Sequence, residues 1–379
     1  MGRLVKILVP TWSMQPVGGI EVGALQAARA LAARGHEIRV FYEVDGPLRS
    51  DWQDFSVDVR QVAPMDPLKP LAMSRSAWQG SRSVWGEPAD VLWLNRPEHI
   101  VWGQAVSRAA GARLLVHFHH KLRWHLPAPL RSGVPAFLAV SDYLKGTYVA
   151  DGLAADKITV LHNAVSADAY PSAGIAEMRR ARAELGLPQD VNLALYYGRL
   201  DAIKGIDVLF DAWRRLAPDP SAARLVIMGS NPDPARDKEI RAAQPPRTIW
   251  LEPRADVVPV LHAVDVVVAP SIWEEPFGRV LIEAMSTGRP VIGARSGGMT
   301  EILSGEMSEF LVDKADAVGL AERLGTFLDW RVTRPELEQT TARWVADRFS
   351  FTAMVDGLEA SLAATAAAPS PALSRRRSA

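Results

Sequence analysis

The chain has 379 residues, enough for two domains that each bury a full hydrophobic core. Its 43 Lys and Arg residues balance its 43 Asp and Glu residues, so no nucleic-acid partner is expected. Hydrophobic residues make up 48% of the chain and Cys is absent, a composition that is typical of globular proteins and excludes disulfides and thiolate metal sites.

The N-terminus runs directly into a predicted strand, without the pattern of a signal peptide. No apolar run approaches the roughly 18–20 residues of a transmembrane helix. We therefore expect a cytoplasmic protein. Trp mixed with Lys and Arg suits an anionic interface, so we also expect peripheral contact of the N-terminal half with a membrane or an anionic carrier. The residues behind this expectation are Arg75, Trp78, Arg82, Trp85, Lys121, Arg123 and Trp124. For residues 121–126 a solvated connector is the alternative.

The first half alternates between apolar strands and helices, which predicts a doubly wound α/β domain. Strands are predicted at 6–12, 38–42, 57–62, 91–94, 113–118, 136–141 and 158–161, and helices before Gly35 and at 98–110 and 142–150. The first turn contains Gly18 and Gly19 but no G-x-G-x-x-G pattern, so a dinucleotide site is weakly indicated and a tight turn is the alternative.

Three histidines, His117, His119 and His120, occur at the end of the strand 113–118. A metal site would need further convergent ligands, which this stretch lacks, so no metal is predicted. Because side chains alternate along a strand, His117 and His119 are expected on one face.

The second half begins where residues 170–174 break the pattern. Strands are predicted at 193–197, 225–228, 249–251, 264–269, from 291 and at 310–312, and helices at 175–185, 206–216, from 280 to Gly288, 315–328, 336–347 and 352–362. Residues 366–379 are rich in Ala, Pro and Ser and are predicted to be a disordered tail.

Two carboxylates stand out in this half. Glu275 lies in the loop after a buried strand and Glu283 lies in the following helix. Ligands of open α/β sheets bind at the carboxyl ends of strands, and the amides around Gly278 would open a helix N-terminus suited to phosphate. The alternative is a first-turn carboxylate and a solvated helix charge.

The sequence Glu-Pro-Phe-Gly, the spacing of the two glutamates, and the following Ala-Met-x-x-Gly-x-Pro-Val and Gly-Gly-x-x-Glu resemble the nucleotide-sugar site of retaining glycosyltransferases of family 4, which have the GT-B fold. The resemblance implies that Glu275 contacts the donor sugar and that Glu283 holds the nucleotide ribose. It also assigns donor binding to Ser271, Pro276, Phe277 and Gly278.

Residues 198–205, Gly-Arg-Leu-x-x-x-Lys-Gly, resemble a second signature of that family. The resemblance implies that Arg199 and Lys204 neutralise the β-phosphate, a role that suits a planar fork and a point charge. A surface pair beside a turn is the alternative. The other implied donor contacts are Gly18 and Gly19 at the diphosphate, His119 (or its rival His120) at the sugar, Arg254 at the base, and Gly229.

The expected fold class is α/β, with two Rossmann-like doubly wound domains facing across a cleft (GT-B). The expected parts are an acceptor-side domain at 1–170, a nucleotide-sugar domain at 171–348, a helix at 349–365 that crosses back to the first domain, and the tail. No Asp-x-Asp occurs in the sequence, so we expect metal-independent, retaining transfer without a cofactor. The expected donor carries UDP or GDP rather than ADP, and the acceptor is a saccharide, a glycolipid or a small molecule. The alternatives are a GT-B epimerase or phosphorylase and a non-catalytic sugar-nucleotide-binding protein.

Overall fold

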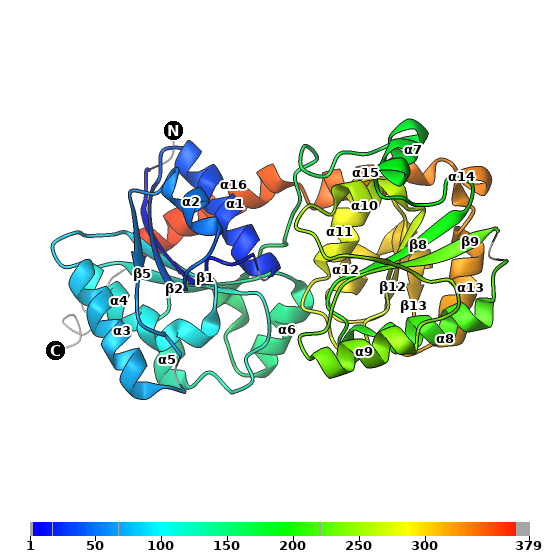
Figure 1. Ribbon diagram of the computed structural model, residues 1–379. Helices are drawn as coiled ribbons and strands as arrows, with labels where there is room; N and C mark the ends of the chain where they lie inside the picture. The colour runs from blue at the N-terminus through cyan, green and yellow to red at the C-terminus, as the bar shows by residue number, and fades with distance from the viewer. Residues whose placement is uncertain (1–2, 17, 67, 220, 369–379) are drawn as a thin grey trace. The chain divides into compact units, whose positions relative to one another are not determined.

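A computed structural model describes residues 3–16, 18–66, 68–219 and 221–368. The chain divides into two compact units, Met1–Asn163 with Thr352–Ala379, and Ala164–Phe351. Each unit is built on its own parallel sheet with helices on both faces (Figure 1). The predicted fold class, two Rossmann-like α/β domains, is confirmed.

The first unit contains a seven-stranded sheet in the order β3-β2-β1-β4-β5-β6-β7. Its strands are β1 (Lys6–Ser13), β2 (Glu37–Val44), β3 (Asp58–Gln61), β4 (Val91–Leu94), β5 (Arg113–Phe118), β6 (Ala136–Ala139) and β7 (Ile158–Val160). Its helices are α1 (Gly19–Ala33), α2 (Leu48–Gln53), α3 (Pro70–Ser83), α4 (Ile100–Ala110), α5 (Ala128–Ser132), α6 (Asp142–Ala150) and α16 (Phe351–Ala367), with short 3₁₀ turns η1 (Pro97–His99) and η2 (Ala155–Lys157). All four residues of β4 are buried, as expected for a strand covered on both faces.

The second unit contains a six-stranded sheet in the order β10-β9-β8-β11-β12-β13. Its strands are β8 (Asn192–Tyr197), β9 (Ala223–Met228), β10 (Ile249–Leu251), β11 (Val266–Ala269), β12 (Val291–Ala294) and β13 (Leu311–Val312). Its helices are α7 (Ile175–Glu184), α8 (Ile206–Leu216), α9 (Pro234–Ala242), α10 (Val258–Ala263), α11 (Arg279–Ser286), α12 (Met299–Ile302), α13 (Ala317–Phe327), α14 (Trp330–Thr333) and α15 (Leu337–Arg348), with 3₁₀ turns η3 (Ala202–Lys204) and η4 (Gly305–Phe310).

A buried carboxylate, Asp265, fixes β11 beside β8. It accepts hydrogen bonds from the amide of Leu193 in β8 at 2.7 Å and from Arg182 of α7 at 2.7 Å. Arg331 of α14 donates to its second oxygen at 2.8 Å. Because a buried charge is costly unless it is paired, this network holds the two central strands in one register.

The boundary between the units lies between Asn163 and Ala164, earlier than the predicted residue 170. The amide of Val165 donates to the carbonyl of Phe349 at 3.2 Å, and the Ser286 hydroxyl donates to the carbonyl of Tyr170 at 2.9 Å. These hydrogen bonds attach residues 164–170 to the second unit.

The helix α16 belongs to the first unit, where it is drawn beside α1 (Figure 1). Arg34 pairs with Asp356 at 2.7 Å and with Glu359 at 2.5 Å, and Glu359 also contacts His36. The helix continues to Ala367, two residues beyond the predicted 365. Of the predicted tail, residues 369–379 lie outside the described residues. Among the residues described, no helix is both long and apolar enough to cross a bilayer.

Candidate active site

The switch point of the second sheet lies between β8 and β11. From β8 the chain proceeds outward to β9 and β10 on one side, whereas β11 is followed by β12 and β13 on the other. The loops 198–205 and 270–278 follow these two central strands, and both leave the sheet at its carboxyl edge. Ligands of open α/β sheets bind at such a point.

Two glycines allow the loops at this edge to approach closely. A Cβ on Gly205 would lie 1.9 Å from the carbonyl oxygen of Pro270, and a Cβ on Gly229 would lie 1.9 Å from that of Gly198. No side chain fits at either distance. The backbones of three neighbouring loops, after β8, β9 and β11, therefore meet without intervening side chains.

This close approach brings together the two sequence motifs. The Lys204 Nζ lies 2.5 Å from Glu275 Oε1, and the same oxygen accepts a 2.6 Å hydrogen bond from the Ser271 hydroxyl. Lys204 Nζ also lies 5.4 Å from the centre of the Trp273 ring. Glu275 and Ser271 are buried. The carboxylate is held in one orientation, and a lysine ammonium can donate further hydrogen bonds beyond this one.

A turn after β12 holds the backbone around Glu275. The amide of Gly298 donates to the Glu275 carbonyl at 2.8 Å, and the Glu275 amide donates to the Ser296 hydroxyl at 3.3 Å. The amide of Gly297 donates to the Glu274 carboxylate at 2.8 Å. Gly297 and Gly298 belong to the predicted Gly-Gly-x-x-Glu motif, and their role here is to position the loop that carries Glu275.

Glu283 forms a separate cluster on the inner side of α11. Its Oε1 accepts from Arg279 Nε at 2.6 Å, and its Oε2 accepts from the Tyr197 hydroxyl at 2.9 Å. Neither partner was predicted. Arg279 precedes Glu283 by four residues, a helical spacing that could have revealed it, whereas Tyr197 ends β8 and lies 86 residues away in sequence.

Protonation at this cluster follows from burial. Burial and the nearby Glu283 charge raise the pKa of Tyr197 well above its usual value. The same two causes raise the pKa of Tyr170 to about 12. Burial alone would lower the pKa of Arg279, but Glu283 and Tyr170 together raise it above its usual value. The tyrosines therefore stay protonated at neutral pH, and the Tyr197 hydroxyl donates to the carboxylate.

The remaining predicted positions in the second unit have different surroundings. Gly278 caps the N-terminus of α11, and the Phe277 ring packs edge-on against Phe349 with 5.7 Å between ring centres. Pro276 is half-buried beside them. Arg199 is largely exposed and pairs with Asp201 at 3.1 Å, and Arg254 is exposed on the segment after β10.

The first unit has its own switch point, between β1 and β4. Gly18 and Gly19 start α1 just after β1. The buried Glu21 of this helix accepts from Arg96, which follows β4 and whose guanidinium lies 4.9 Å from the centre of the Trp12 ring. This ion pair was not predicted.

The three histidines have different surroundings. His117 is buried and packs on the His119 ring with 4.1 Å between centres, so the prediction of a shared face holds. Burial lowers the pKa of His117 to about 3, which keeps it neutral. His119 Nε2 lies 3.3 Å from Asn95 Oδ1, and His120 Nε2 lies 2.5 Å from Glu98 Oε1.

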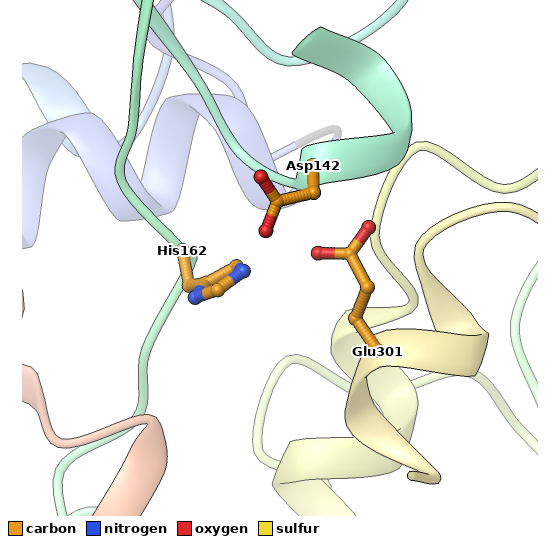
Figure 2. A group of neighbouring side chains, drawn as sticks. All are labelled: Asp142, His162 and Glu301. Atoms are coloured by element: carbon orange, nitrogen blue, oxygen red, sulfur yellow. The ribbon is translucent and has the colours of Figure 1, made fainter. Parts of the chain in front are cut away.

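Another histidine of the first unit, His162, lies close to a carboxylate. Figure 2 shows the Asp142 carboxylate at the start of α6 turned towards the ring of His162, which follows β7, and their ligand atoms lie within 4.8 Å. Glu301, also drawn there, belongs to α12 of the second unit. Two ligands within one unit are fewer than a structural metal site uses.

Two α/β units, each built on a parallel sheet, are the architecture of the GT-B fold. Residues 192–329 match the family described as "Glycosyl transferases group 1", and residues 17–169 match "Glycosyltransferase Family 4". The chain belongs to glycosyltransferase family 4, group 1.

Curated relatives agree with this assignment. A D-inositol 3-phosphate glycosyltransferase of Xylanimonas cellulosilytica is 30% identical over 82% of this chain and 83% of its own length. Another, from Corynebacterium efficiens, is 32% identical over 48% of this chain, and that match spans 46% of the relative.

Solved structures share the fold. HepE of Anabaena, determined in complex with UDP and glucose, has a TM-score of 0.80 and 22% identity, covering 95% of this chain and 100% of that one. A glycosyltransferase from Rickettsia africae has a TM-score of 0.83 and 18% identity, covering 97% and 100%.

Glu283→Ala is expected to weaken binding of the correct nucleoside diphosphate roughly 10- to 150-fold, because a hydrogen bond to a charged acceptor contributes about 1.5–3 kcal/mol. Calorimetric titration measures this. Tyr197→Phe is the matched control, since it removes one partner of Glu283 but keeps the carboxylate, and it should retain most of the affinity. Unchanged affinity in folded Glu283→Ala would remove Glu283 from the site.

Proposed function

We propose that this protein transfers a sugar from a nucleoside-diphosphate sugar to an acceptor hydroxyl, with retention of anomeric configuration and without a metal ion. The observation that carries the proposal is the Lys204–Glu275 contact at the switch point of the second sheet, with Glu283 buried on the adjoining helix. A cation, a fixed carboxylate and a helix N-terminus at one sheet edge suit a phosphorylated sugar.

Each cluster would hold a different part of the donor. Lys204, together with the exposed Arg199 on the same loop, would neutralise the diphosphate. Glu275, held by Ser271 and Lys204, would accept hydrogen bonds from sugar hydroxyls. Glu283 would use its remaining lone pairs to accept from the ribose hydroxyls, while Arg279 and Tyr197 keep it oriented.

The reaction breaks the bond between the anomeric carbon and the phosphate oxygen and forms a bond from that carbon to the acceptor oxygen. In a front-face attack the leaving phosphate takes the proton of the acceptor hydroxyl, so no enzyme nucleophile is needed. The growing charge on the phosphate would be stabilised by preorganised cations, and Lys204, half-buried at the switch point, is one of them.

The relatives indicate which donors and acceptors to test first. HepE of Anabaena was solved with UDP and with UDP-glucose, which makes UDP sugars the first donors to test, followed by GDP and then ADP sugars. The curated relatives named as D-inositol 3-phosphate glycosyltransferases make that cyclitol phosphate the first acceptor to test. A relative from Salmonella typhimurium is a lipopolysaccharide 1,2-N-acetylglucosaminetransferase, so saccharides of glycolipids are the second class of acceptor to test.

A thermal-shift screen with UDP, GDP and ADP sugars tests the donor class, because a ligand at about 100 times its Kd stabilises the native state by about 2.7 kcal/mol. The proton NMR signal of the new anomeric centre then reports retention. If none of the three kinds of nucleotide sugar raises the unfolding temperature, the proposal is contradicted. Conversion of the donor without an acceptor into an epimer would favour the epimerase alternative.

Activity is expected to persist in EDTA. The sequence contains no Asp-x-Asp, and Lys204 and Arg199 provide positive charge beside the proposed phosphate position. Transfer rates measured with and without chelator should agree within error. Complete loss in EDTA that is restored by added Mg²⁺ or Mn²⁺ would contradict metal independence.

A further inference from the structure

The helix α3 of the first unit carries its large apolar side chains on the outside. Leu71 is 88% exposed, Trp78 is 61% exposed and Trp85, just after the helix, is 80% exposed. The buried positions of α3 are the small residues Ser76 and Gly80. This is the reverse of an ordinary surface helix, which turns its apolar face to the core.

The small buried side results from tight packing on α4. A Cβ on Gly80 would lie 2.8 Å from Val106 Cγ2 and 2.9 Å from Trp102 Cζ2, so no larger residue fits there. That packing explains why small residues face α4. It does not explain why Leu71, Trp78 and Trp85 face solvent, where polar residues would serve the fold equally well.

The exposed residues form one stripe of uniform charge. Leu71, Arg75, Trp78, Arg82 and Trp85 are spaced by alternating steps of four and three, which places them on one face of the helix. Residues 68–86 contain Lys69, Arg75 and Arg82 but no Asp or Glu. The Arg82 guanidinium lies 5.4 Å from the centre of the Trp78 ring, and Trp78, Ser81, Arg82 and Trp85 line an open hollow of about 560 Å³.

We propose that this stripe, Leu71–Arg75–Trp78–Arg82–Trp85, docks the first unit on an anionic lipid bilayer. Trp and Leu would enter the boundary between headgroups and acyl chains, where amphipathic aromatic rings are favoured. Arg75 and Arg82 would contact the lipid phosphates, and each cation near such a surface adds to binding. The charge of the stripe selects this occupant: an uncharged saccharide would gain nothing from Arg75 and Arg82, which have Lys69 nearby and no acid within residues 68–86.

The other sequence-predicted segment, Lys121–Arg123–Trp124, has different surroundings. Lys121 lies 3.4 Å from Asp151, Arg123 is exposed and Trp124 is half-buried. We assign docking to the stripe on α3 and Trp85, because its large apolar side chains are the more exposed.

Co-sedimentation of the full chain with vesicles tests this proposal. The vesicles are of phosphatidylcholine alone, or of phosphatidylcholine and phosphatidylglycerol in equal parts. The protein is expected to pellet with the anionic vesicles at about 0.1 M salt, and less at about 1 M, where the screening length falls from about 10 Å to about 3 Å. Equal recovery in the supernatant with both kinds of vesicle would overturn the proposal.

Two variants locate the surface. Arg75→Glu/Arg82→Glu is expected to lower partitioning onto anionic vesicles by roughly 30-fold or more, and Trp78→Ser/Trp85→Ser is expected to lower it at both salt concentrations. Lys238→Glu/Arg343→Glu, at exposed cations of the second unit, is the matched charge control and should bind as the unaltered protein does. Equal loss in that control would overturn the assignment to α3.

Two further measurements distinguish lipid docking from a role of α3 in donor binding or in self-association. The α3 variants should keep the thermal shift given by the nucleotide sugar, because no α3 residue is part of the proposed donor site in the second unit. Their elution on gel filtration without lipid should also be unchanged. A shift from dimer to monomer in the Trp variant would overturn the proposal and assign the stripe to contact between two copies of the chain.

Discussion

Lys204→Ala is expected to lower kcat by about 100- to 1000-fold with a smaller change in the donor KM. The Lys204 ammonium already lies 2.5 Å from a buried carboxylate oxygen, so its position is fixed before the donor binds. Negative charge on the leaving phosphate grows as the sugar–phosphate bond breaks. An interaction that is stronger in the transition state than in the ground state appears in kcat, not only in KM.

The chain offers a matched control for this substitution. Lys314 pairs with Glu274, the residue next to Glu275, so Lys314→Ala also removes a lysine from an ion pair on the same loop. Steady-state rates of Lys314→Ala should stay within a few-fold of the unaltered protein. Lys204→Gln, which removes the charge but keeps a hydrogen-bond donor for Glu275, checks that the loss does not come from an unpaired Glu275. If folded Lys204→Ala and Lys204→Gln both keep a near-normal kcat, the phosphate-site assignment is wrong.

Gly205→Ala is expected to destabilise the protein by about 2–5 kcal/mol and to abolish donor binding. The φ of Gly205 is +77°, and the new Cβ would meet the Pro270 carbonyl oxygen at 1.9 Å. Relief of that overlap requires movement of the segment that begins with Ser271. Ser271 and the following loop position Glu275, so the damage reaches the proposed sugar site.

Gly186→Ala separates the steric effect from backbone strain. Gly186 has a similar φ of +66°, but nothing lies within 4 Å of its Cβ position. Gly186→Ala should lower the free energy of unfolding by only about 1–2 kcal/mol, the strain of a residue in the left-handed region, and should leave nucleotide binding intact. Thermal unfolding of both variants provides the comparison. Equal destabilisation of the two variants would show that the overlap between residue 205 and Pro270 adds nothing to the loss of stability.

The sequence predicts the elements with strong apolar patterns. The helix α8 has the predicted bounds 206–216, because its buried residues recur at helical spacing after Gly205. The helix α9 was missed because Ile240 is its one buried residue, so it shows no apolar period. Its start could have been found from Asp233, which accepts from the Ala235 amide, and from Pro234 in the first turn.

In the candidate site, too, local sequence pattern predicts some features and misses others. Both glutamates and the lysine could be selected from motifs, yet the Lys204–Glu275 contact joins residues 71 positions apart. That contact depends on β8 and β11 being neighbours, which follows from the tertiary pairing and not from local pattern. Tyr197 and Asp265 could not be predicted for the same reason, since each acts on a residue distant in sequence.

Hydrogen–deuterium exchange of the full chain, with and without the nucleoside diphosphate that gives the largest thermal shift, tests most directly whether the second unit holds the donor. In EDTA, we expect slower exchange in peptides covering residues 198–205, 271–283 and 296–298, and no slowing in the peptide covering α3. Protection absent from all three peptides with UDP, GDP and ADP would contradict a donor site at the switch point between β8 and β11.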